Sequence, residues 1–161
     1  MRKALLFVPL AFLGCSLINP TPKKIQSTHV CKVEKYEAPY WVCCQSTFVV
    51  VGKIYTPNPT MLKEEEAFSN AMMELIRKLE NKTKTMLNKL DINDKKEIEK
   101  ILNQVKDYTI VHSMEGKKWY LKELKMLYVQ AVMERGEFKK FLKSLIKTDE
   151  KKFEIAFNES F

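Results

Sequence analysis

The chain has 161 residues, of which 45% are hydrophobic and 30% are charged, as in an ordinary folded domain. These fractions exclude a disordered tail, a collagen-like repeat and a multi-span membrane protein. The net charge is +8, but only three of the 28 basic residues are arginines. Proteins that read nucleic acids depend on arginine for two-pronged contacts with phosphates and bases. We therefore expect no nucleic-acid partner.

Residues 1–15 predict a lipoprotein signal. Met1-Arg2-Lys3 is a short basic segment, and Ala4–Leu13 is an apolar run. A membrane-spanning helix takes about 20 residues, so this shorter run is typical of a secretory signal instead. The run ends in Phe12-Leu13-Gly14-Cys15. This sequence resembles a lipobox, the motif in which a cysteine thiol is acylated and becomes the new amino terminus; Phe12 and Leu13 depart from its commonest form.

We therefore predict a signal peptide over residues 1–14 and lipidation, for example with palmitate, at Cys15. The alternative is an ordinary signal peptide that happens to contain a cysteine. Ser16 follows the cysteine, which by the sorting rule of enteric bacteria implies the outer membrane, with the protein on its periplasmic face or at the cell surface. The polar, proline-containing stretch that follows predicts a lipid-attached tether over residues 15–36 and a single domain over residues 37–161.

Three further cysteines follow: Cys31, Cys43 and Cys44. In an oxidising compartment Cys31 can pair with either Cys43 or Cys44, which leaves one cysteine over. Such a loop closure contributes about 3 kcal/mol. Two alternatives are inert buried thiols and a metal site that adds His29, although the cysteine spacing departs from that of structural zinc. We predict the disulfide, with no metal and no cofactor.

The first half of the domain predicts a strand followed by two helices. Ser46–Tyr55 is β-branched and aromatic, and Gly52 within it marks a bulge or a close approach. After a proline-containing break, a helix is predicted from Met61 to about Leu90. Asp91–Asp94 offers a break and a cap for the second helix. The apolar faces of the two helices comprise Leu62, Phe68, Ala71, Met72, Leu75, Ile76 and Leu79, and then Ile98, Ile101, Leu102 and Val105.

The second half predicts three strands followed by helix. Tyr108–Met114 and Lys117–Leu124 flank Glu115-Gly116, which we interpret as a hairpin turn, and Lys125–Glu134 alternates, with Leu127, Val129, Ala131 and Met133 on one face. Arg135-Gly136 ends that strand. A helix then starts at Glu137 with an apolar face of Phe138, Phe141, Leu142, Leu145 and Ile146, and Asp149 caps a short helix that ends near Phe157. The predicted fold is α+β, with helices on one face of a small, mostly antiparallel sheet in the order β-α-(α)-β-β-β-α.

Several short motifs of this sequence occur in the order known from one family. They are Ala38-Pro39-Tyr40-Trp41-Val42, then Val49-Val50-Val51-Gly52, then Ala67, Ala71 and Leu75 at four-residue steps, and Leu127–Val132 before the next helix. With the lipobox, they resemble the Lpp-twenty group of small outer-membrane lipoproteins of epsilon-class bacteria, which includes the flagellar lipoprotein FlgP. The resemblance implies an outer-membrane lipoprotein without known catalytic residues. Its relatives are surface antigens or parts of an assembly around the flagellar motor.

The sequence contains no constellation that predicts catalysis. Glu64, Glu65 and Glu66 are consecutive, so a helix spreads them around its circumference, where they favour the helix dipole. His29 and His112 are far apart in the sequence, and His112 falls in a predicted strand, where we interpret it as a strand residue. We interpret Pro39-Tyr40-Trp41 as an apolar plug against the core, the alternative being a ligand-stacking site.

Two functions follow from these observations. The first is a non-catalytic structural or assembly component of the cell envelope, which associates through sheet edges or the remaining cysteine as a homo-oligomer or with a partner lipoprotein. The second is a binding module for an anionic envelope or host component. Its candidate anion-binding residues lie on the lysine-rich faces of the last predicted helices: Lys139, Lys140, Lys143, Lys147, Lys151 and Lys152.

Overall fold

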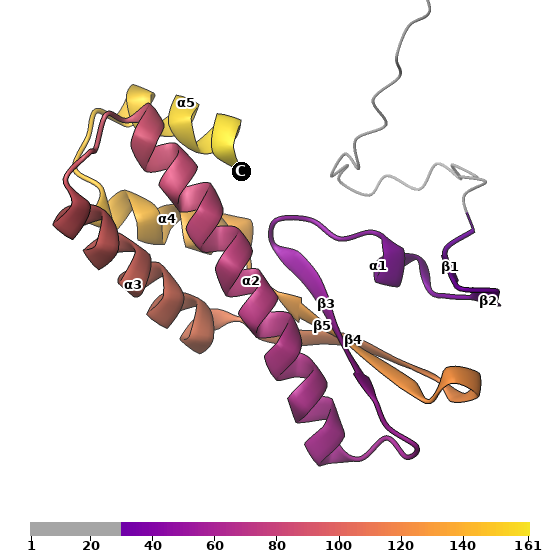
Figure 1. Cartoon of the computed structure of the whole chain (residues 1–161). Helices are drawn as coiled ribbons and strands as arrows, with labels where there is room; N and C mark the ends of the chain where they lie inside the picture. Colours follow the sequence, from indigo (N-terminus) through magenta and orange to yellow (C-terminus); the bar gives the residue numbers. More distant parts are fainter. Residues whose placement is uncertain (1–29) are drawn as a thin grey trace, which may run out of the picture.

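The computed structural model describes residues 30–161, which form five α-helices and two antiparallel sheets (Figure 1). A hairpin of β1 (Lys32–Val33) and β2 (Tyr36–Glu37) is followed by the one-turn helix α1 (Tyr40–Cys43). The main sheet contains β3 (Val49–Tyr55), β4 (Met114–Leu121) and β5 (Met126–Val132). The long helices are α2 (Met61–Lys89), α3 (Lys95–His112), α4 (Arg135–Leu145) and α5 (Glu150–Ser160). The predicted α+β class is confirmed.

Strand β5 lies at the centre of the main sheet, antiparallel to both β3 and β4. The alternation predicted for this strand is confirmed, because Leu127, Val129 and Ala131 are buried and pack with alanines of α2. Tyr128 points to the opposite face, where it joins a separate apolar cluster. The sheet is therefore covered on one face by α2 and keeps a second face for the amino-terminal segment.

Gly52 allows α2 to cross close over β3. A Cβ atom built on Gly52 would meet the carbonyl oxygen of Ala67 and the amide nitrogen of Ala71 at distances that real Cβ atoms do not show. Both alanines are fully buried, so only small residues occur on either side of this crossing. The close approach predicted from the glycine is confirmed.

The predicted helix breaks are confirmed by their caps. The Thr60 hydroxyl accepts a hydrogen bond from the Lys63 amide at the start of α2, and the Asp94 carboxylate accepts one from the Glu97 amide at the start of α3. These side chains satisfy amide groups that have no partner within the helix. The prediction was wrong for Leu62, which is 70% exposed, because the first turn of α2 precedes Ala67, its first buried residue.

The predicted strand Tyr108–Met114 is wrong, because α3 continues to His112. The Tyr108 ring stacks on Phe141 of α4 with 3.9 Å between the ring centres, and Thr109 is fully buried. Both contacts lie on the helical face that packs into the core. The β-branched and aromatic residues of this segment therefore serve a helix, and tertiary packing overrides their strand propensity.

The predicted turn at Glu115-Gly116 is also wrong, since both residues lie within β4 beside an irregularity in its pairing with β5. The chain reverses later, through the short 3-10 helix η1 (Lys122–Leu124) and Lys125, whose φ is 51°. Two strands, rather than three, therefore follow α3.

The two carboxy-terminal helices close the core. Helix α4 begins at Arg135, two residues before the predicted start, so Arg135-Gly136 belongs to the helix. Asp149 caps α5 as predicted, because its carboxylate accepts hydrogen bonds from the Lys151 and Lys152 amides. The largest fully buried aromatic side chains of the core come from these helices: Phe138, Phe153 and Phe157.

Candidate functional site

Residues 31–43 form a segment closed by a disulfide between Cys31 and Cys43, whose Cα atoms lie 5.8 Å apart. Inside this cysteine-closed segment, the Ala38 amide donates a hydrogen bond to the Cys31 carbonyl oxygen. Of the two pairings that the sequence left open, the structure contains Cys31–Cys43. Cys44 follows directly and is half-buried at the end of α1, where its amide donates to the Tyr40 carbonyl oxygen.

The cysteine-closed segment covers the sheet face opposite α2. Val42 of the segment is buried in one cluster with Tyr128 and Leu121 of the sheet, and Trp41 is half-buried against the same cluster. Figure 1 shows this segment beside the main sheet, well away from α4 and α5. Trp41 therefore contributes to an apolar seal over the sheet, whereas the Tyr40 side chain is 60% exposed.

The folded chain begins earlier than residue 37, where the sequence placed the start of the domain. The hairpin of β1 and β2 occupies residues 32–37, and its Val33 and Tyr36 side chains pack against the cluster over the sheet. The disulfide and this packing hold in place a stretch whose composition is polar. The predicted signal peptide, Cys15 and His29 lie outside the described residues.

A cleft of about 390 Å³ lies between the cysteine-closed segment and β3. Its apolar wall is formed by Val33 and Val42 from the segment and by Val51 and Tyr128 from the sheet. Lys32 and Lys53 line it from the two sides, and no lining residue is acidic. Burial raises the pKa of the Tyr128 hydroxyl, and the nearby Glu34 carboxylate adds to that effect. We call this site the lysine cleft.

The lysine cleft is not evident from the sequence as a whole, although strand alternation contained a signal for one side of it. Lys53 lies directly opposite Tyr128 in the β3–β5 pairing, so both side chains fall on the face that α2 does not cover. The disulfide, together with the packing of Val33 and Tyr36 on the sheet, brings Lys32 to the other side of that face.

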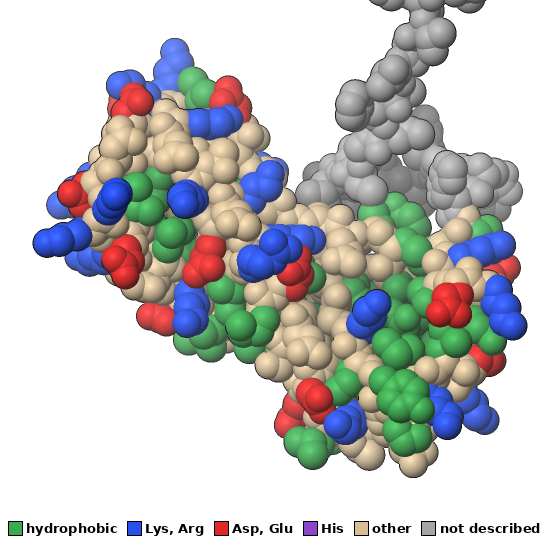
Figure 2. All heavy atoms as spheres, in the orientation of Figure 1, with side chains coloured by type: hydrophobic (Ala, Val, Ile, Leu, Met, Phe, Trp, Pro, Cys, Tyr) green, Lys and Arg blue, Asp and Glu red, His purple; other side chains and the backbone are tan. Residues whose placement is uncertain are grey.

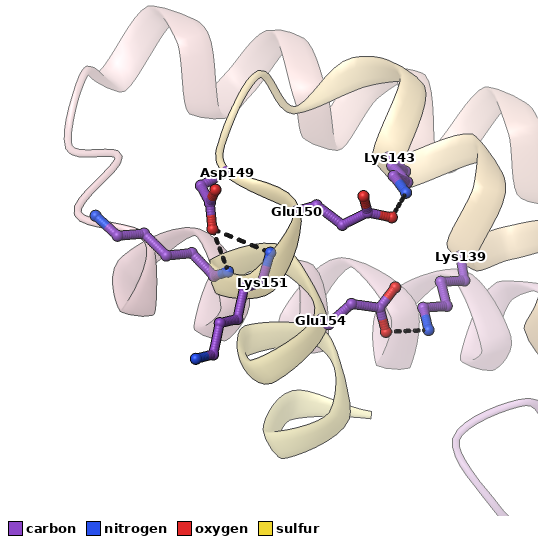
Figure 3. Close-up of polar contacts among 7 residues, drawn as sticks. Lys139, Lys143, Asp149, Glu150, Lys151 and Glu154 are labelled. Carbon is purple, nitrogen blue, oxygen red and sulfur yellow. Dashed lines mark hydrogen bonds and ion pairs between the residues drawn. The ribbon is translucent and has the colours of Figure 1, made fainter.

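Three of the six lysines proposed as an anion-binding surface are paired with carboxylates. Lys139 pairs with Glu154, Lys140 with Glu137, and Lys143 with Glu150, and Figure 3 shows the first and third of these pairs between α4 and α5. The Glu150 carboxylate holds the pKa of Lys143 above its ordinary value, and Lys143 lowers the pKa of Glu150 in return.

The other three lysines of that surface, Lys147, Lys151 and Lys152, form no ion pair within residues 30–161. Lys147, after α4, is exposed. Lys151 and Lys152 use their backbone amides to cap α5 on Asp149 (Figure 3). The ion pairs offset much of the positive charge that the sequence places on this surface.

The interpretation of His112 as a strand residue was wrong, because it is the last residue of α3. Its ring stacks on Tyr108 with 4.1 Å between the ring centres. Glu64 pairs with Lys118 of β4, and Glu66 pairs with Lys63 in the first turns of α2. Within residues 30–161, no group of three or more His, Cys, Asp or Glu side chains is arranged to hold a metal ion. No helix in the same range is long and apolar enough to cross a membrane.

The two edges of the main sheet differ in how they are shielded. At the β3 edge, the Val49 carbonyl oxygen accepts from the Ser46 amide, and the Val51 amide donates to the side-chain oxygen of Gln45. Strand β4 forms the other edge, and Lys117 and Lys118 lie at its irregular stretch. Lysines and irregularities discourage the addition of further strands, so both edges are partly protected.

No protein-family model matches the chain, and a search of curated proteins finds no match.

Proposed function

We propose that this chain is a non-catalytic lipoprotein of the outer membrane, acylated at Cys15, that serves as a structural or assembly component of the cell envelope. The observation that carries the proposal is the apolar run ending in Gly14-Cys15, followed by a domain whose first elements are closed by a disulfide. Disulfides persist in exported proteins and are rare in the cytosol.

The placement of the disulfide supports an anchored domain. Residues 16–30 lie between Cys15 and the cysteine-closed segment, and an extended chain of this length spans up to about 50 Å. An acylated Cys15 would thus leave the domain free to reach partners beyond the lipid head groups. The disulfide joins the two ends of the segment, and apolar packing holds that segment on the sheet.

The alternative function, a lysine-rich module for an anionic component, has less support on the surface formed by α4 and α5. Lys139, Lys140 and Lys143 each have a carboxylate partner within the chain. An external anion would have to compete with these local pairs. We therefore favour assembly with a second copy or a partner lipoprotein over binding through these lysines.

The anchor is tested by the intact mass of the protein purified from membranes. We expect a chain that begins at Cys15 and carries acyl groups, and we expect the Cys15→Ala variant to lose both the added mass and membrane retention. Cys44→Ala is the matched control, because it removes a different thiol and should leave acylation unchanged. A wild-type chain that is unmodified or cut elsewhere would contradict the proposal.

Assembly is tested on the same membranes by chemical cross-linking at low and at high salt. Association through a sheet edge should persist at high salt, whereas association through exposed lysines weakens because salt screens exposed charges. A protein that stays monomeric in both conditions would argue against an assembly role.

A further inference from the structure

We propose that the lysine cleft is a binding site for a small anionic amphiphile, that is, a molecule with one carboxylate or phosphate head group on a short alkyl chain. The cleft combines an apolar wall with two ammonium groups, and this combination matches both halves of such a ligand. The proposal does not depend on acylation of Cys15 and concerns a different surface from the lysines of α4 and α5.

The two lysines of the cleft belong to the lysines that form no ion pair with a carboxylate of the described residues. Lys63, Lys118 and Lys139 each form an ion pair with a carboxylate of the chain. Within residues 30–161, neither Lys32 nor Lys53 has such a pair, and both side chains are exposed at the cleft. A ligand carboxylate or phosphate at the cleft would therefore meet lysines that need not give up an internal carboxylate partner.

The apolar wall accounts for the alkyl part of the ligand. Val42 and Tyr128 are buried where the segment meets the sheet, and Val33 and Val51 are half-buried beside them. The volume of about 390 Å³ is near the lower end of the range for small-molecule sites, about 300–1,000 Å³. Figure 2 shows apolar side chains gathered over this part of the molecule, with basic side chains among and around them.

The disulfide closes the segment that forms one wall of the cleft. Lys32 and Val33 are on the strand that follows Cys31, and Val42 precedes Cys43, so one covalent bond fixes both sides of the segment wall. The opposite wall belongs to the main sheet and does not depend on the disulfide. Reduction should therefore open one wall and weaken binding while the sheet stays folded.

The test uses the full chain with Cys15→Ala, refolded so that Cys31–Cys43 forms, because this protein can be measured without detergent. The chain contains two tryptophans, Trp41 and Trp119, and both belong to the apolar cluster beside the cleft. Their fluorescence is thus a direct probe of the site. The ligands are monomeric decyl phosphate and decanoate, compared with neutral decyl maltoside, inorganic phosphate and vesicles that contain phosphatidic acid.

We expect saturable binding of one decyl phosphate or decanoate per chain. Each exposed ammonium–anion contact contributes modestly, so the Lys32→Ala/Lys53→Ala double variant should bind about tenfold more weakly. Lys147→Ala, which removes an exposed lysine on another part of the molecule, should bind like the parent protein. A circular dichroism melt of the double variant confirms that it is folded.

Four results would overturn the proposal. They are equal binding of decyl maltoside, binding of inorganic phosphate as tight as that of decyl phosphate, unchanged affinity in the double variant, and binding to the vesicles without binding of the monomers. A reductant should also weaken the binding measured by fluorescence, and an unchanged affinity after verified reduction would contradict the role of the disulfide.

Discussion

The crossing of α2 over β3 leads to a sharp prediction for Gly52→Ala. The added methyl group would meet the backbone of Ala67 and Ala71, and neither a carbonyl oxygen nor an amide nitrogen can move without the helix. Overfilling a packed core usually costs about 1–3 kcal/mol. Because the obstacle here is backbone, we expect the upper end of that range, about 3 kcal/mol of unfolding free energy.

The assay is urea denaturation followed by circular dichroism. For a domain of this size the free energy of unfolding falls by about 2 kcal/mol per molar urea, so the midpoint for Gly52→Ala should fall by about 1.5 M. Gly136→Ala is the matched control, because a Cβ there has one neighbour, a side-chain oxygen of Glu134 at 3.6 Å. This control lies in α4 and should gain about 0.5–1 kcal/mol. A Gly52→Ala protein within about 0.5 kcal/mol of wild type would refute the reasoning.

Three further predictions concern local features. Cys31→Ser removes the disulfide, whose loop closure contributes about 3 kcal/mol, so amide hydrogen exchange in the cysteine-closed segment should accelerate. Cys44→Ser is the control and should leave that exchange unchanged. Equal protection from exchange in both variants would contradict the Cys31–Cys43 pairing. Asp149→Ala removes the cap of α5 and should cost about 1 kcal/mol, measured as a lower urea midpoint, and an unchanged midpoint would show that the cap contributes nothing. Lys143→Ala should raise the pKa of Glu150 towards its ordinary value in an NMR titration. Because Lys143 lowers the pKa of Glu150, their ion pair stabilises the folded protein above the ordinary carboxyl pKa, and this stabilisation is lost as the pH falls through the lowered pKa. A Glu150 pKa that stays low in the Lys143→Ala variant would show that another group lowers it.

The amino-acid sequence by itself determined the elements that depend on local chemistry. The caps at Thr60, Asp94 and Asp149 satisfy amide groups within a few residues, so they are readable from neighbouring positions. The alternation of β5 was readable because a strand with one face on α2 must alternate. Gly52 predicted the close approach of another backbone because a glycine within a strand has no side chain to pack and is uncommon there without such a reason.

The tertiary structure alone decided features that depend on contacts between distant residues. Tyr108 is helical because Phe141, in another helix, stacks on its ring, and no local pattern contains that information. Gly116 lies within β4, at the irregularity of its pairing with β5, and no local pattern distinguishes this position from a hairpin turn. The choice of Cys43 over its neighbour Cys44 likewise depends on how α1 presents each side chain. The lysine cleft is of the same kind, since Lys32 and Lys53 come from separate strands, and the folded segment brings them to one cleft.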